Sequence, residues 1–223
     1  MTTARPTIYL TNFASRRPPQ RRIEVRTSPS TPTWAEADAC VEHCIGWRRN
    51  LAMVMRYTGL RVQQAMGLRW DDLDLDTATL RMRGELGKSR QERAGRIIPV
   101  SPHLVAEVQG WGVREGWLVE AGGRATERRL ACRSHAVGGA WRRAGVREEA
   151  WKGRPQHAFR KAFVSGLIGA GASREAVEHL VGHSLGLAGV YTDSDVLGLR
   201  AAVALVPAIG AGNVGPLRRR GGE

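Results

Sequence analysis

Apolar residues recur at helical spacing through the first part of the chain and predict three short helices. The run TWAE is typical of a capping box, with Thr33 as the N-cap and Glu36 three residues later. The dipeptide Thr58-Gly59 breaks the second helix. The helices are expected over residues 33–44, over residues 48–57, and from about Arg61 to an acidic turn at 71–76.

The apolar period then changes to that of β-strands. Residues 77–84 and 96–100 predict two strands of a small hairpin or meander, joined by a polar segment that carries Lys88 near its bend. The pair Ser101-Pro102 follows as a helix start, with a serine N-cap and proline at the first helical position. A helix to about Trp111 is therefore expected.

The second half of the chain is helical again. HAFRKAFVSGLIGAG predicts a helix after Pro155, Ser173 caps the next helix, and Gly182 is expected to end it. A last amphipathic helix is expected from about Asp195 to Leu205, and residues 112–150 predict only short helices, one of them around 140–144. The pattern predicts a mostly α-helical domain with a small antiparallel sheet, an α+β fold, over residues 33–206.

Basic segments flank this domain. Residues 1–32 hold six arginines against one acid, Glu24, with Pro and Ser scattered among them. We expect a flexible N-terminal arm, which either orders on DNA or is a solvated tail without a task. Residues 207–223 are expected to form a flexible basic C-terminal tail.

Charge narrows the class of partner. The chain has 34 Lys and Arg residues against 21 Asp and Glu, a net charge of +13, which suits a polyanion better than a small neutral substrate. Double-stranded DNA is the first expectation and an anionic membrane surface the second. No segment approaches the ~18 consecutive apolar residues of a spanning helix, and the start lacks the order of a secretion signal. We therefore expect a cytoplasmic protein associated with the nucleoid.

Cysteine and histidine spacing predicts neither disulfides nor a metal site. The three cysteines are an odd and sparse set, unlike a disulfide framework. Cys40 and Cys44 are interpreted as small apolar residues on one helix face, because no second ligand pair follows at zinc-site spacing. His179 and His183 are four residues apart, but Gly182 should end the helix and turn His183 away. No metal or other cofactor is expected.

Four candidate reactive side chains lie within these elements. Lys88 is one of only three lysines among the basic residues; its ammonium can release a proton, so it is either a general acid or a solvated hairpin charge. His157 and Arg160 are three residues apart near a helix start, and form either a phosphate site or a surface pair. Arg61 lies at the N-terminus of another helix and is either a phosphate ligand or a surface charge without a specific role.

The stretch LVGHSLGLAGVYTDSD contains two further polar rings, His183 and Tyr191. Tyr191 follows a Gly-rich segment, and Thr192, Asp193 and Ser194 come directly after it. This pattern favours a mobile or exposed phenol over a core tyrosine.

The order of these signals resembles the catalytic domain of the tyrosine recombinase (phage integrase) family. The resemblance covers roughly residues 33–205. It is carried by four stretches: YTGLRVQQAMGLRWDDLDLD, GELGKSRQERAGRIIPVS, HAFRKAFVSGLIGAGAS and EHLVGHSLGLAGVYTD.

The resemblance implies the fold of DNA breaking-rejoining enzymes and a site-specific recombinase or integrase that needs neither metal nor ATP. It implies these roles: Arg61 and Arg160 clamp the non-bridging oxygens of the scissile phosphate, Lys88 protonates the leaving 5′ oxygen, His157 and His183 assist proton transfer and hold the phosphate, and Tyr191 is the nucleophile of a 3′-phosphotyrosyl link. It also implies self-association on DNA, from a dimer to a synaptic tetramer.

The chain departs from the family pattern in several places. Gln64 stands where the family usually has an acidic residue, Lys161 stands where a histidine is common, and Tyr191 follows His183 by eight positions rather than nine. The basic segment 1–32 stands in place of a helical core-binding domain, which leaves a minimal enzyme, a fragment and a decayed relative open. Two other functions stay open: an inert DNA-binding relative that regulates a full-length recombinase, and a type IB topoisomerase-like relaxase.

Overall fold

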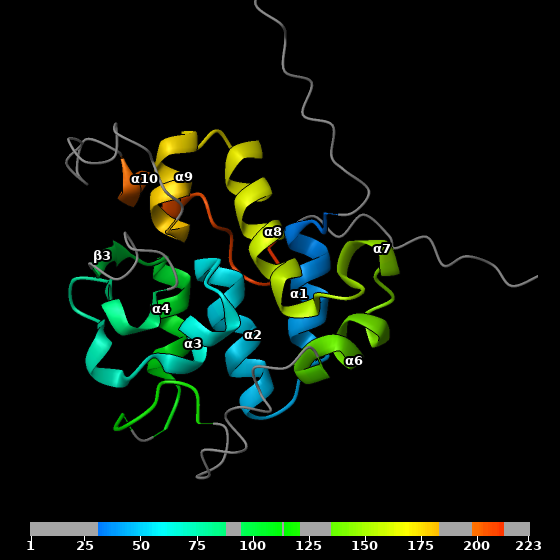
Figure 1. Ribbon diagram of the computed structural model, residues 1–223, viewed down its shortest axis with the longest axis horizontal. Coiled ribbons are helices and arrows are strands. Elements are labelled where there is room, and N and C mark those ends of the chain that lie inside the picture. The colour runs from blue at the N-terminus through cyan, green and yellow to red at the C-terminus, as the bar shows by residue number, and fades with distance from the viewer. Residues whose placement is uncertain (1–30, 88–94, 113, 121–134, 183–197, 212–223) are drawn as a thin grey trace, which may run out of the picture.

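Two helices, α2 (Trp47–Thr58) and α8 (Pro155–Gly169), pack against each other at the centre of the fold (Figure 1). The computed structural model describes residues 31–87, 95–112, 114–120, 135–182 and 198–211. Every residue from Leu51 to Thr58 is buried. Helix α2 therefore has other elements on all sides over its last two turns.

The remaining helices surround this pair. Helix α1 (Trp34–Glu42) and α6 (His135–Arg143) contact both central helices, α3 (Val62–Gly67) and α4 (Pro102–Gln109) contact α2, and α7 (Glu148–Trp151) and α9 (Arg174–Val181) contact α8. In Figure 1, α3 and α4 lie to one side of α2, and α6 and α7 lie to the other. The predicted mostly helical fold with a small antiparallel sheet is confirmed.

The sheet has three antiparallel strands in the order β1-β2-β3. They are β1 (Leu73–Asp74), β2 (Thr79–Met82) and β3 (Arg96–Pro99), and short 3-10 helices cover Trp70–Asp72 and Gly84–Leu86. The predicted strands at 77–84 and 96–100 are confirmed, with Leu80 opposite Ile98. The prediction of a turn throughout 71–76 is wrong, because buried Leu73 pairs with Leu80 and adds the first strand.

Local capping signals fix the helix ends as predicted. The Thr33 Oγ1 accepts a hydrogen bond from the Glu36 N–H at 3.2 Å, and the Glu36 Oε2 accepts one from the Thr33 N–H at 2.7 Å. Ser101 caps α4, and Ser173 caps α9 by accepting from Ala176 N at 3.1 Å. These bonds satisfy backbone donors that the first turn of a helix leaves without partners.

The last helix, α10 (Leu199–Ala204), begins later than predicted. Gly198 has a left-handed φ of +64° and forms its N-cap, so a continuous helix from Asp195 is wrong. Helix α10 contacts α9 and β3.

The described residues beyond α10 belong to the packed domain. The Ile209 N–H donates to Tyr57 Oη at 3.0 Å, and the Gly210 N–H donates to Asp38 Oδ2 at 3.4 Å. The prediction of a flexible tail from residue 207 is therefore wrong for these positions. The expected arm at 1–32 and the rest of the tail lie almost entirely outside the described residues.

The apolar core is continuous from α1 to α10. Trp141 and Phe159 pack with their ring centroids 4.8 Å apart, and the Trp141 indole N–H donates to the Pro155 carbonyl at 2.9 Å. Cys40 and Cys44 are both buried in this core, as predicted for small apolar residues. The prediction that both lie on one helix face is wrong, because α1 ends at Glu42 and Cys44 follows it. Within the described ranges, no helix has the length and apolar character needed to cross a bilayer.

Candidate active site around Arg160

Arg160 joins the ends of two helices that are far apart in the sequence. It lies in α8 and is only 3% exposed. Its Nη1 donates to the Gly59 carbonyl at 2.9 Å, and its Nη2 donates to the Val181 carbonyl at 2.8 Å. Gly59 is the C-cap of α2 and Val181 is the last residue of α9. One guanidinium therefore holds both helix ends at the same place.

Arg61 follows this junction by two residues and forms the N-cap of α3. Its backbone N–H donates to Gln64 Oε1 at 3.1 Å, and Gln64 is buried. A neutral amide oxygen serves as a helix-capping acceptor as a carboxylate does. Gln64, the departure from the family pattern, thus keeps the backbone of Arg61 in place.

His157 precedes Arg160 by one helical turn and is exposed at the surface. Partial loss of hydration lowers the pKa of its imidazole, and the positive charges of Arg160, Lys161, Arg154 and Arg61 lower it further. The ring therefore lies within the electrostatic reach of both candidate phosphate-binding arginines. The interpretation of His157 and Arg160 as a surface pair is wrong, because Arg160 is buried.

The end of α9 is held from a second direction by Arg96 of β3. The Arg96 Nη2 donates to the Leu180 carbonyl at 3.4 Å. A Cβ on Gly182, which has a φ of +73°, would lie 2.5 Å from Arg96 Nη1 and 2.7 Å from its Cζ. The guanidinium therefore lies directly against the Gly182 backbone.

Sequence reasoning missed Arg96, although the strand pattern contained a signal for it. Alternate residues of a strand point to the same face. Ile98 is 1% exposed and Val100 is 3% exposed. Ile97, which lies between Arg96 and Ile98, is 62% exposed. Arg96 shares the face of the two buried residues, and an arginine on the buried face of a strand needs partners inside the protein.

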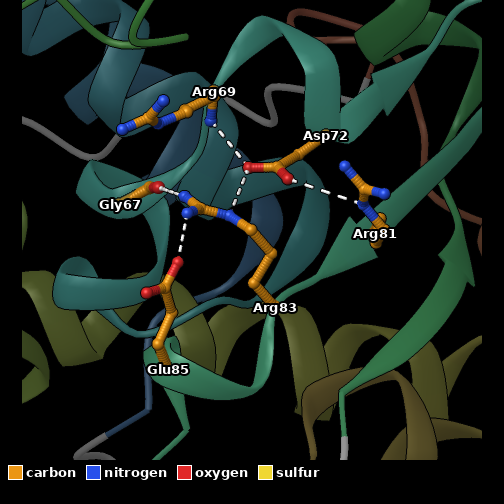
Figure 2. Close-up of polar contacts among 6 residues, drawn as sticks. All are labelled: Gly67, Arg69, Asp72, Arg81, Arg83 and Glu85. Atoms are coloured by element: carbon orange, nitrogen blue, oxygen red, sulfur yellow. Dashed lines mark hydrogen bonds and ion pairs between the residues drawn. The ribbon is translucent and has the colours of Figure 1, made fainter.

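The base of the Lys88 hairpin is held by an ionic cluster around Asp72, whose side chain is 1% exposed (Figure 2). Asp72 Oδ2 accepts from Arg83 Nε at 3.1 Å and from the Arg69 backbone N–H at 2.9 Å. Arg83 also donates to the Gly67 carbonyl at 2.5 Å and pairs with Glu85. The residues that directly follow β2, Arg83 and the 3-10 helix Gly84–Leu86, are thereby tied to the end of α3.

Three of the six predicted site residues can be placed, and they come together. Arg61, His157 and Arg160 surround the junction of α2, α3, α8 and α9. Lys88, His183 and Tyr191 lie outside the described residues and stay predictions. Among the residues that the structure describes, no group of three or more His, Cys, Asp or Glu side chains has the arrangement of a metal site.

Comparison with known proteins identifies relatives of the whole domain. A model of the phage integrase family matches residues 35–196. Tyrosine recombinase XerC of Rhodospirillum centenum is 32% identical over 158 residues, which are 68% of this chain and 44% of that protein. XerC of Azotobacter vinelandii is 31% identical over 189 residues, 82% of this chain and 60% of that protein. XerC of Xanthomonas campestris pv. campestris is 28% identical over 160 residues, 68% of this chain and 46% of that protein. The chain spans about half the length of the curated relatives it matches.

Solved structures share the fold at lower identity. An integrase from mycobacterium phage Brujita superimposes with a TM-score of 0.62 at 19% identity, over 82% of this chain and 59% of that one. A XerA recombinase superimposes with a TM-score of 0.53 at 17% identity, over 81% of this chain and 64% of that one. The family model covers most of this chain, and its match includes all six predicted site residues. The chain belongs to the phage integrase family of tyrosine recombinases.

Proposed function

We propose that this chain is a site-specific DNA recombinase that cleaves and rejoins duplex DNA through a 3′-phosphotyrosyl intermediate. The observation that carries the proposal is the pair of bonds from Arg160 to the Gly59 and Val181 carbonyls. These bonds hold Gly59 and Val181 next to Arg160. In the chain, Gly59 comes two residues before Arg61, and Val181 comes two residues before His183. Membership of the phage integrase family supports the same class of reaction.

In this proposal, Arg61 and Arg160 bind the non-bridging oxygens of the scissile phosphate. Charge builds on these oxygens as the phosphorus becomes five-coordinate, and fixed cations in a partly dehydrated site stabilise that charge. A guanidinium carries five N–H donors, so bonds to two carbonyls are compatible with bonds to an anion. The carbonyl bonds fix the plane of the Arg160 guanidinium before DNA binds.

Proton transfer is assigned to His157, His183 and Lys88. The lowered pKa of His157 keeps its imidazole uncharged at neutral pH, where it can accept a proton or a hydrogen bond. Tyr191 Oη attacks the phosphorus, the bond from phosphorus to the 5′ oxygen breaks, and Lys88 gives its proton to that oxygen. A histidine takes the phenolic proton. A second 5′ hydroxyl then attacks the phosphotyrosine, so rejoining needs no ATP.

A nicked suicide duplex tests the covalent step. A nick close to the scissile phosphate lets the short 5′-hydroxyl fragment diffuse away after cleavage, so the protein stays attached to DNA. We expect a denaturant-stable adduct on DNA from the flanks of the protein's own locus, and none with Tyr191→Phe. Tyr9→Phe is the matched control, because it makes the same change outside the predicted catalytic domain at 33–206.

The possible results separate the proposal from its rivals. DNA binding without an adduct on any such site would establish the inert DNA-binding relative instead. Adduct formation and relaxation of supercoiled DNA without any sequence preference would establish the relaxase. An adduct that persists in Tyr191→Phe would show that another residue is the nucleophile.

Duplex DNA is the partner that this reaction requires. The net charge of +13 predicts a strongly salt-dependent affinity, because basic contacts release condensed counterions; log Kd rises with log salt by about 0.9 for each phosphate neutralised. Self-association on DNA, from dimer to synaptic tetramer, and association with the nucleoid belong to the same proposal. Sedimentation of the protein with and without a cognate duplex measures the assembly.

A further inference from the structure

We propose that Arg96 is a positioning residue for strand transfer, which fixes the C-terminal end of α9 directly ahead of His183. The inference rests on the proposed function, since His183 and Tyr191 matter only if the chain cleaves DNA. It concerns a residue outside the six that the resemblance implies. Arg96 acts on the backbone of Leu180 and Gly182 rather than on DNA.

The geometry around Arg96 shows contact with the last turn of α9. Its Nη2 donates to the Leu180 carbonyl at 3.4 Å, and its guanidinium lies against Gly182. The charge of Arg96 lowers the pKa of half-buried His179, although burial of that imidazole is the larger cause. The hydrogen bond and the close packing both place the guanidinium against the last turn of α9.

A cation at this position has a physical effect on the helix end. The last carbonyls of a helix lack partners within the helix, and the negative end of the helix dipole lies there. Arg96 supplies both a donor and a positive charge to that end. Gly182 leaves room for the flat guanidinium because it has no side chain.

Two arginines from different elements hold adjacent carbonyls at this end. Arg96 of β3 bonds the Leu180 carbonyl, and Arg160 of α8 bonds the Val181 carbonyl. The direction in which the chain leaves α9 is therefore set relative to both the sheet and α8. Under this proposal, a shift of the Gly182 backbone displaces any reacting group that follows it in the chain, and a misplacement of about 1 Å can cost on the order of 100-fold in rate.

The first experiment compares Arg96→Met with Arg174→Met. Both changes remove one positive charge from the surroundings of α9, but Arg174 lies at the opposite end of the helix with its side chain 80% exposed. We expect Arg96→Met to slow adduct formation on nicked DNA by about 10- to 100-fold, with the Kd for DNA changed less than threefold relative to Arg174→Met. Equal adduct rates for the two variants would overturn the inference.

Arg96→Lys tests how the side chain acts and serves if the methionine variant does not fold. Lysine keeps a charge and a donor for the Leu180 carbonyl but loses the planar group that packs on Gly182. An adduct rate between those of wild type and Arg96→Met is expected. A lysine variant as slow as the methionine variant would contradict the claim that the bond to Leu180 contributes.

Hydrogen exchange provides a readout that does not depend on cleavage. The Gly182 amide donates to the His179 carbonyl at 3.0 Å and so reports on the end of α9. Arg96→Met should speed exchange at Val181 and Gly182 while exchange of the Val177 amide, which bonds Ser173, stays as in wild type. Unchanged exchange at Val181 and Gly182 would overturn the inference even if cleavage slowed.

A modified substrate separates this role from that of the Lys88 hairpin, to which β3 also leads. A bridging 5′ sulfur in the scissile phosphodiester leaves as a thiolate, which needs no general acid because a thiol has a much lower pKa than an alcohol. Lys88→Ala should regain most of its rate on this substrate, whereas Arg96→Met should stay as slow relative to wild type as on normal DNA. Recovery of Arg96→Met would place its effect in the hairpin and overturn the inference. Absence of any adduct with wild type would instead refute the proposed function.

Discussion

Gly59, whose carbonyl accepts a bond from Arg160, occupies a position that has no room for a side chain. It has a φ of +64°, and a Cβ there would lie 2.4 Å from Cδ1 of buried Phe163. Gly59→Ala should lower the free energy of unfolding by about 2–4 kcal/mol, from left-handed strain together with overpacking. Gly145→Ala is the matched control, since its φ of +69° has open space around it, and about 1–2 kcal/mol is expected. Urea denaturation measures both, and equal losses would contradict the packing argument.

His179 should make stability depend on pH. Burial, followed by the charge of Arg96, lowers its pKa in the folded protein below the ordinary value of 6.5. The unfolded chain then binds the proton more readily, so this contribution to stability is fully present above pH 6.5 and is lost progressively as the pH falls from 6.5 through the lowered pKa of the folded protein. His157, with its own lowered pKa, acts in the same direction.

The variant His179→Gln removes one of these two contributions. The fall in the urea midpoint between pH 7.5 and pH 5.5 should become shallower than in wild type. Parallel pH curves for the two proteins would show that the pKa of His179 is not lowered in the folded state.

At the scale of elements, Asp72 ties the hairpin that carries Lys88 to the end of α3. Its buried carboxylate accepts from Arg83 and from the Arg69 backbone. Asp72→Asn removes the charge that holds Arg83 and should cost about 1–3 kcal/mol. The exposed neighbour Asp71 is the control, and Asp71→Asn should stay within about 0.5 kcal/mol. Thermal unfolding measures both variants, and equal midpoints would refute the role of Asp72.

The sequence could predict the elements that depend on local contacts. The caps at Thr33, Ser101 and Ser173 were predictable because each involves partners at most three residues away. Strand β1 was not, because it is defined by its pairing with β2 across a turn, and the acidic residues around Leu73 outweigh its short apolar pattern.

The features of the candidate site likewise divide into those that a local motif predicts and those that depend on distant contacts. Motif order assigned Arg61, His157 and Arg160, and the structure brings these three together. The burial of Arg160 was not predictable, since its carbonyl partners lie 101 and 21 residues away. Arg96 was missed because abundant arginine hid a strand position that alternation places on the buried face.

At the scale of the whole molecule, one buried ion pair joins the beginning, the centre and the end of the described chain. Asp38 of α1 accepts from Arg56 Nε of α2 at 2.6 Å, with the Arg56 side chain fully buried. Asp38 also accepts from the Gly210 N–H, beside the bond from Ile209 to Tyr57. The residues after α10 are thereby fastened to α1 and α2, and α2 ends at the candidate site.

Arg56→Met should be among the most destabilising single changes in the chain. It leaves the Asp38 carboxylate buried without its cation, which typically costs about 3–5 kcal/mol. It also removes the guanidinium that lies 5.5 Å from the Trp34 ring and 5.1 Å from the Tyr57 ring. The double variant Asp38→Leu with Arg56→Met should recover part of this loss, because neither partner then buries an unpaired charge. Guanidinium denaturation of the wild type, the two single variants and the double variant measures the coupling. A double variant less stable than Arg56→Met would show that the bond to Gly210, rather than the ion pair, is the main contribution of Asp38.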